Sequence, residues 1–238
     1  MSGHSKWATT KRHKDLVDAK RAGVFTKLSR NITIAARNGG DPDMNFSLRL
    51  AVDRAKAASM PKENIEKAIK KGTGELEGAI LEEVMYECFA PGGVALLVEA
   101  VTDNRNRTMP EIKELLVKFG GSIGSQNSVK WMFEHKGVIF IANEQVKDKD
   151  EMMMFLVEFG ADDVVEEEGG LAVYCGFNNF EKVKKQLEAK GVKVEFAEMA
   201  WVAKEKLKID DAARQKIDAL VEALEDHDDV NGVYTNVS

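Results

Sequence analysis

The hydrophobic residues recur with two periods, and the change of period separates a helical part of the chain from a part that alternates strands and helices. From Asp15 to Asn38 the apolar residues share one side of a helical wheel drawn at about 100° per residue, which predicts a helix with one buried face. Gly23 is a position at which this stretch can divide into two helices. The apolar side consists of Phe25, Leu28, Ile32, Ala35 and Ala36.

Two further helices are predicted before residue 75. One follows Asn45, a favourable N-cap residue, and ends near Ala58. The other begins near Pro61, buries one face and stops at Gly72. The buried face is formed by Ile65, Ala68 and Ile69.

From Glu82 onward the period is that of strands. Two strands are expected to pair around the turn Pro91-Gly92-Gly93, and Thr108 with Glu111 predicts a capping box at the start of the next helix. The elements expected here are the strands Val84–Phe89 and Val94–Val101, the helix Met109–Phe119 and the strand Val129–Phe133.

The following segment predicts the order βαββαβ, which is the ferredoxin-like arrangement. Its elements are the strand Val138–Ile141, the helix Asp150–Phe159, the strands Asp163–Glu167 and Leu171–Cys175, the helix Phe180–Ala189 and the strand Lys193–Ala197. A helix Asp210–Leu224 and a strand Gly232–Val237 remain, and they are expected to complete the preceding α/β unit, because a lone helix and strand cannot bury both of their faces.

The pattern therefore predicts an α+β protein of three domains. A basic helical domain spans residues 1–75, and a discontinuous α/β domain, also expected to be ferredoxin-like, spans 80–134 and 207–238. A ferredoxin-like domain, residues 135–206, is inserted within the second.

Composition narrows the class of protein. With 44% hydrophobic and 31% charged residues, the 238-residue chain is expected to fold around real cores. Neither an apolar run long enough to span a bilayer nor a signal core is found, so we expect a soluble cytoplasmic protein without a membrane partner. Cys88 and Cys175 match no CxxC spacing, which argues against a disulfide scaffold and a zinc ribbon.

Charge is distributed unevenly along the chain. Residues 1–71 hold 16 lysines and arginines against 7 acidic residues, whereas residues 72–238 hold 18 against 33. A basic domain on an acidic protein indicates a polyanionic partner, namely DNA or ribosomal RNA; the alternative is a merely solvated helical surface.

In the N-terminal residues, from Gly3 to Arg21, cations alternate with small and aromatic residues. Such a segment is suited to neutralising phosphates and stacking on bases. Trp7 either stacks on a base or anchors the N-terminal tail. In the helix Asp15–Asn38, Lys27, Arg30 and Arg37 lie opposite the apolar side and are expected to project together. The candidate nucleic-acid-binding residues are Lys6, Trp7, Lys11, Arg12, Lys14, Lys20, Arg21, Lys27, Arg30, Arg37, Lys62, Lys67, Lys70, Lys71, Arg105 and Arg107.

The loop that carries Arg105 and Arg107 has two interpretations. Its arginines can grip phosphate or carboxylate beside a helix N-terminus. Alternatively, the loop is held together by hydrogen bonds of its own Asn and Asp side chains.

Other motifs do not predict catalysis, a metal or a cofactor. Gly120 to Gly124 matches GxSxG around Ser122, but a helix precedes it and a strand follows, the reverse of a nucleophile elbow. Asp226-His227-Asp228-Asp229 contains metal-type ligands at adjacent positions, which rarely converge on one ion. We therefore expect a non-enzymatic protein without cofactor or metal.

Several motifs together resemble the YebC/PmpR family over nearly the whole chain. They include Gly3-His4-Ser5-Lys6-Trp7, Met60-Pro61-Lys62, Lys71-Gly72-Thr73-Gly74, Pro91-Gly92-Gly93-Val94, Thr102-Asp103-Asn104-Arg105-Asn106-Arg107-Thr108 and Trp131-Met132-Phe133-Glu134. The resemblance implies a helical domain followed by two α/β domains, and a non-enzymatic regulator of gene expression that binds DNA. The alternative that it implies is a ribosome-associated translation factor that binds ribosomal RNA and relieves stalling at proline-rich stretches.

Overall fold

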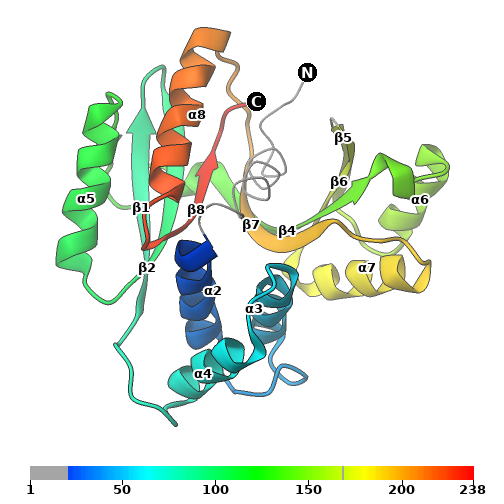
Figure 1. Cartoon of the computed structure of the whole chain (residues 1–238). Helices are drawn as coiled ribbons and strands as arrows, with labels where there is room; N and C mark the ends of the chain where they lie inside the picture. The colour runs from blue at the N-terminus through cyan, green and yellow to red at the C-terminus, as the bar shows by residue number, and fades with distance from the viewer. Residues whose placement is uncertain (1–20, 168) are drawn as a thin grey trace. The chain divides into compact units, whose positions relative to one another are not determined.

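The computed structural model describes residues 21–167 and 169–238 and confirms the α+β class, with a helical segment followed by two antiparallel sheets (Figure 1). Within the described residues the chain forms two compact units. The first unit comprises residues 21–129 and 210–233, and the second unit comprises residues 130–209 and 234–238. The boundaries given above for three domains stay a prediction.

Three helices open the first unit: α2 (Arg21–Ala36), α3 (Phe46–Ala57) and α4 (Lys62–Thr73). The apolar side predicted for α2 is confirmed, because all five of its residues belong to or pack against one core shared with α3 and α4. Asn45 caps α3 as expected, and its side chain accepts a hydrogen bond from the Leu48 amide over 3.1 Å. The helical segment therefore has a hydrophobic core of its own.

Gly72 has a different role from the predicted one. The helix α4 continues to Thr73, and Gly74 ends it in the left-handed conformation with φ of 83°. A Cβ atom on Gly72 would lie 2.3 Å from the Thr33 carbonyl oxygen and 2.6 Å from the Ala36 side chain on α2. The glycine is thus required for the close contact between α2 and α4 and not for termination, which is why the prediction of a stop at Gly72 was wrong.

We expect Gly72→Ala to lower the free energy of unfolding by about 1–3 kcal/mol, because the backbone of α2 must move to admit the methyl group. Urea unfolding followed by circular dichroism measures the change. Gly78→Ala is the matched control, since a Cβ there would meet only the Lys71 side chain at 3.4 Å or more. Equal free energies of unfolding of the two variants would show that the packing of α2 against α4 does not require a glycine at position 72.

The first sheet has the strand order β3-β1-β2-β8. Its strands are β1 (Glu82–Ala90), β2 (Val94–Thr102), β3 (Ser122–Ile123) and β8 (Val230–Thr235). The strands β1 and β2 pair from Ala90↔Val94 around the predicted turn, where Gly92 and Gly93 have positive φ of 82° and 77°. The expectation that the C-terminal helix and strand complete this sheet is confirmed, since β8 adds to β2 and α8 (Asp211–Glu225) contacts α5 (Arg105–Lys118).

The start of α5 differs from the prediction. The N-cap residue is Asn104, whose side-chain oxygen accepts from the Arg107 amide over 3.2 Å. Thr108 lies inside the helix and is fully buried, and its hydroxyl is 2.6 Å from a carboxylate oxygen of Asp229. The predicted capping box was therefore wrong, because a buried acid from a distant part of the chain engages the threonine.

The second sheet has the order β5-β6-β4-β7, and the predicted βαββαβ arrangement is observed. Its strands are β4 (Phe133–Ala142), β5 (Asp163–Glu167), β6 (Gly170–Cys175) and β7 (Phe196–Ala203), with the helices α6 (Lys149–Glu158) and α7 (Phe177–Ala189) and a short 3-10 turn η2 (Asn143–Gln145). Figure 1 shows α7 running beside the sheet, and Gly137 of β4 lies directly under the Phe180 ring.

Three strand predictions in this region differ from the structure. Most of the predicted strand Val129–Phe133 is a 3-10 turn, η1 (Lys130–Met132), and the strand predicted at Val138–Ile141 is longer, since β4 runs from Phe133 to Ala142. The last strand runs from Phe196 to Ala203 instead of from Lys193 to Ala197, because it pairs along β4 from Phe140 back to Phe133. Among the residues that the structure describes, none of the helices is long and apolar enough to traverse a bilayer.

Candidate nucleic-acid interface

The predicted nucleic-acid-binding residues differ in where the structure places them. Arg21 is the first residue of α2, and Lys62, Lys67, Lys70 and Lys71 belong to α4. Six others lie outside the described residues: Lys6, Trp7, Lys11, Arg12, Lys14 and Lys20.

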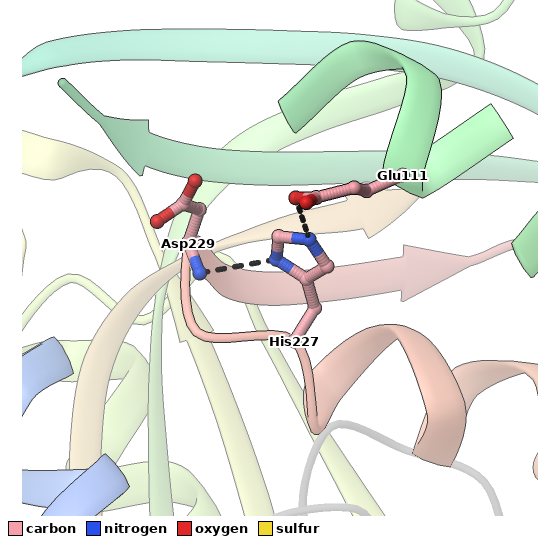
Figure 2. A group of neighbouring side chains, drawn as sticks. All are labelled: Glu111, His227 and Asp229. Carbon is pink, nitrogen blue, oxygen red and sulfur yellow. Dashed lines mark hydrogen bonds and ion pairs between the residues drawn. The ribbon is translucent and has the colours of Figure 1, made fainter. Parts of the chain in front are cut away.

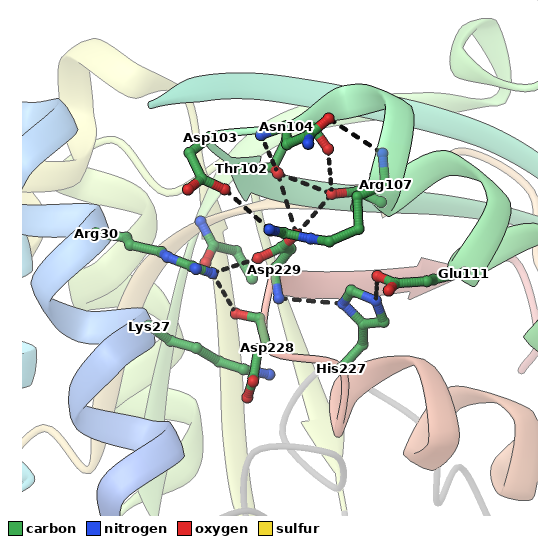
Figure 3. Close-up of polar contacts among 12 residues, drawn as sticks. Lys27, Arg30, Thr102, Asp103, Asn104, Arg107, Glu111, His227, Asp228 and Asp229 are labelled. Atoms are coloured by element: carbon green, nitrogen blue, oxygen red, sulfur yellow. Dashed lines mark hydrogen bonds and ion pairs between the residues drawn. The ribbon is translucent and has the colours of Figure 1, made fainter. Parts of the chain in front are cut away.

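Lys27 of α2 contacts the last residue of α8, and Arg30 contacts the loop that joins α8 to β8 (Figure 3). The Lys27 ammonium donates to the Glu225 carbonyl oxygen. One Arg30 nitrogen lies 2.8 Å from the Asp228 carbonyl oxygen and 2.6 Å from a carboxylate oxygen of Asp229. Burial lowers the pKa of Lys27, opposed by the charges of the neighbouring Glu225, Asp228 and Asp226.

The expectation that Lys27, Arg30 and Arg37 project away from the apolar side holds for Lys27 and Arg30, but these two side chains are only partly exposed. Both lie opposite the core of the helical segment, as the wheel predicts, but that side of α2 packs against the end of α8. Arg37 is exposed, and one of its nitrogens donates to the Leu81 carbonyl oxygen over 2.6 Å. Two of the three cations are thus engaged by the end of α8 and the acidic loop that follows it.

Asp229 is the centre of this contact (Figure 3). Its carboxylate is only 2% exposed, yet it lies beside two arginines. Besides the bond from Arg30, the carboxylate lies 2.9 Å from an Arg107 nitrogen, 2.6 Å from the Thr108 hydroxyl and 3.1 Å from the Thr102 hydroxyl. The network joins α2, the end of β2, the start of α5 and the beginning of β8.

The protonation of Asp229 follows from these partners. Burial by itself would raise the pKa of this carboxyl, because the charged form loses hydration. The hydrogen bonds from Thr108, Arg107 and Thr102 and the charge of Arg30 outweigh burial and lower the pKa to about 2. Asp229 is therefore ionised at neutral pH and forms a buried ion pair with Arg30.

The arginines of the loop before α5 are paired with acids of the first unit. Arg105 lies 2.7 Å from Glu82, and both side chains are more than half exposed. Arg107 lies 3.0 Å from Asp103 and also reaches Asp229. Together with the Asn104 cap, these bonds match the interpretation of a self-held polar loop more closely than that of two arginines poised for an anion.

Glu111, His227 and Asp229 bring their ligand-type atoms within 4.8 Å of one another, a grouping found once among residues 21–167 and 169–238 (Figure 2). The Asp229 amide donates to His227 Nδ1 over 3.1 Å, so the hydrogen of His227 is on Nε2, 3.0 Å from the Glu111 carboxylate. Both ring nitrogens and both carboxylate oxygens of Asp229 have protein partners. This arrangement holds the α8–β8 loop through hydrogen bonds within the protein.

Ser122 lies in a context that differs from a nucleophile elbow. Its strand β3 follows the helix α5 through Gly120, whose φ is 78°, and Ser122 pairs with Phe89 of β1. A nucleophile elbow requires a strand before the serine and a helix after it. The GxSxG match is thus part of a helix-to-strand connection.

The lysines of α4 differ from Lys27 and Arg30 in that they are exposed. Lys67, Lys70 and Lys71 are exposed, while Ile65 and Ala68 of the same helix are buried. Within the described part of the chain these three lysines form no ion pair, whereas Lys62 lies 3.5 Å from Glu66. At spacings of three and four residues, the three lysines share one side of α4.

Sequence reasoning missed Asp229 as the key residue of the α2 contact. The residue stands in a run of acids, of which Asp226 and Asp228 are exposed, so the run resembled a solvated turn. Val230, directly after Asp229, begins a buried strand. An acid next to a buried strand could have indicated that Asp229 is itself buried.

The comparisons with known proteins cover both parts of the chain. The model described as TACO1/YebC protein N-terminal domain matches residues 5–75, and the model described as TACO1/YebC second and third domain matches residues 81–237. A protein of Halothermothrix orenii named "Probable transcriptional regulatory protein" is 49% identical, over 99% of this chain and 94% of its own length. A Thermotoga maritima protein of the same name is 48% identical, over 99% and 93%.

A solved structure agrees with these matches. The crystal structure of a conserved hypothetical protein from Aquifex aeolicus superposes with a TM-score of 0.85 at 44% identity, and the match covers 93% of this chain and 92% of that one. The two family models together cover most of the chain, and the relatives align over 99% of it at 48–49% identity. These findings agree with each other. This chain therefore belongs to the TACO1/YebC family, whose relatives are named as regulatory proteins.

Proposed function

We propose that this protein regulates gene expression without catalysis, by binding nucleic acid through phosphate contacts of its basic helical segment. The observation that carries the proposal is the exposed lysine side of α4, formed by Lys67, Lys70 and Lys71. The names of the relatives support a regulatory role.

The geometry of α4 favours phosphate as the ligand. Three lysines within two turns of one helix present flexible ammonium groups to a single side, which suits a chain of phosphates and reads no base sequence. Their partner must supply the negative charge, since within the described residues no acid pairs with them. Lys27 and Arg30 are committed to the end of α8 and the loop that follows it, so the proposed contact uses α4 in place of α2.

A salt titration tests this proposal. Binding of the whole protein to a labelled duplex is measured by fluorescence anisotropy between about 0.05 and 0.2 M salt. If ~6 phosphates are contacted, a plot of the logarithm of the association constant against that of salt concentration has a slope of about −5. A slope near zero, or no binding at low salt, would refute an electrostatic phosphate contact.

The nature of the bound species separates DNA from RNA. Retention on promoter DNA in the presence of competitor DNA supports a transcriptional regulator. Co-sedimentation with ribosomes, lost at raised salt, supports the alternative of a ribosome-associated translation factor that binds ribosomal RNA.

A further inference from the structure

Two helices of the helical segment, α3 and α4, are joined by a short turn, residues 58–61. Each helix is 12 residues long, and both contribute to the core that they share with α2. Figure 1 shows α4 lying across α2 and α3, and each of the three helices contacts the other two. Two helices that cross and are joined by a turn of three or four residues form a helix-turn-helix.

The turn has the backbone conformation that such a motif requires. Ser59 has φ of 59°, in the left-handed region where helix-turn-helix motifs often carry glycine. The Met60 amide donates to the Ala55 carbonyl oxygen over 2.9 Å, and both of these residues are buried in the shared core. Pro61 then precedes the first helical residue of α4. The turn thus determines where α4 begins and which of its sides faces outward.

The inner side of α4 is fixed to α2. Ile65 and Ala68 are buried, and the Thr33 hydroxyl of α2 lies 3.1 Å from the Ala68 carbonyl oxygen. Further along α4, Gly72 permits the close approach to α2 that is described above. A helix that enters a groove of DNA must be held by its supporting elements, and α2 supplies that support.

The outer side of α4 has its charges in an ordered arrangement. At about 100° per residue, Glu63 lies near the middle of the exposed side, while Lys62 and Lys71 lie at its two margins. Twelve residues make a helix about 18 Å long, and the major groove of B-form DNA, about 12 Å wide, admits an α-helix. With α4 in that groove, the two marginal lysines approach the phosphate chains on either side of it.

We propose that α3 and α4 form a helix-turn-helix that inserts α4 into the major groove of duplex DNA, where Glu63 reads a base edge. Glu63 is the second residue of α4, and residues near the N-terminus of the second helix contact the bases in such motifs. Its carboxylate accepts a hydrogen bond from the N4 amino group of cytosine, so a C·G pair is favoured at the contacted position. The inference rests on the proposed function and deepens it, because it names duplex DNA as the ligand of the α4 lysines.

The first test compares duplex DNA with duplex RNA of the corresponding sequence, each of about 20 base pairs, or two helical turns. The A-form RNA duplex offers similar phosphates, but its major groove is too deep and narrow for side chains to read. Fluorescence anisotropy with the full-length protein measures both affinities at the same salt concentration. We expect the DNA to be bound about tenfold or more tightly than the RNA.

The second test asks whether Glu63 reads a base. Duplexes selected from a randomised library should carry cytosine at one position with the wild-type protein and adenine at that position with Glu63→Gln, because an amide pairs with N6 and N7 of adenine. The matched control is Glu77→Gln, which removes the same charge from an exposed residue beyond the end of α4 and should keep the wild-type preference. Thermal unfolding checks that both variants are folded.

The outcomes separate this inference from the proposed function. Equal affinity for the two duplexes, with a steep salt dependence, overturns groove insertion while the phosphate contact of α4 stands. Tighter binding of the RNA duplex also overturns it and favours the alternative of an RNA-binding factor. A wild-type protein without base preference, or an unchanged preference in Glu63→Gln, contradicts readout by Glu63. A flat salt profile on both duplexes removes the inference and the proposed function together.

Discussion

Replacing Asp229 with alanine should destabilise the protein more than any other single substitution considered above, by about 3 kcal/mol or more. The substitution leaves the half-buried guanidinium of Arg30 without its anion and removes the acceptor shared by the buried hydroxyls of Thr102 and Thr108. Removal of one partner from a buried ion pair costs far more than the pair contributes, because the remaining charge is left desolvated. Urea unfolding at neutral pH measures the loss.

Asp103→Ala is the matched control, because Asp103 also pairs with Arg107, over 3.0 Å, but is exposed. We expect that variant to lose less than about 1 kcal/mol. If the two variants were equally stable, the Asp229 network would not be what joins α2 to the sheet.

The contribution of Asp229 should also depend on pH. Its folded-state pKa of about 2 lies below the ordinary value of 3.8, so the ionised form is favoured by folding. The stabilisation is complete above the unfolded-state pKa and is lost as the pH falls from about 4 towards 2. The stability difference between the wild-type protein and Asp229→Ala should therefore shrink across this window, and a difference that stays constant would contradict the ionised state.

Substitution of Lys67, Lys70 and Lys71 together by glutamine should weaken binding to duplex DNA about tenfold or more at ~0.1 M salt. The slope of the salt dependence should fall by roughly 3, because about 0.9 counterions are released for each phosphate neutralised. Glutamine keeps helix propensity close to that of lysine, so the fold is expected to persist. The anisotropy titration described above provides both quantities.

The control for this variant removes the same charge elsewhere. Lys113, Lys193 and Lys216 are exposed and lie outside the helical segment, and their joint replacement by glutamine changes the net charge equally. Equal loss of affinity in both triple variants would mean that net charge, and not the α4 side, determines binding.

The helical periodicity and the strand periodicity were sufficient to predict most elements. The apolar side of α2 and the cap at Asn45 are encoded within a few turns of chain, so local sequence predicts them. The βαββαβ order of the second sheet was predicted for the same reason. Element ends were less accurate where a distant partner decides them, as in β7, whose extent depends on its pairing with β4.

The candidate site was predicted less well than the fold. A helical wheel correctly locates Lys27 and Arg30 opposite the core of the helical segment, but it contains no information on what lies across from them. Their partners are the end of α8 and the loop around Asp229, about 200 positions later in the chain. The exposed lysines of α4 were included among the predicted residues, but the sequence did not distinguish them from the engaged cations.

The sequence by itself determined the α+β class, the uneven distribution of charge and the sides of the helices that are apolar, because these depend on composition and on periods of a few residues. Only the tertiary structure decided that Gly72 serves a helix contact, that Asp229 is a buried anion paired with Arg30, and that Lys27 donates to the Glu225 carbonyl oxygen at the end of α8. The physical reason is that desolvation and pairing of a charge depend on what the fold brings within a few ångströms, and those neighbours come from remote parts of the chain.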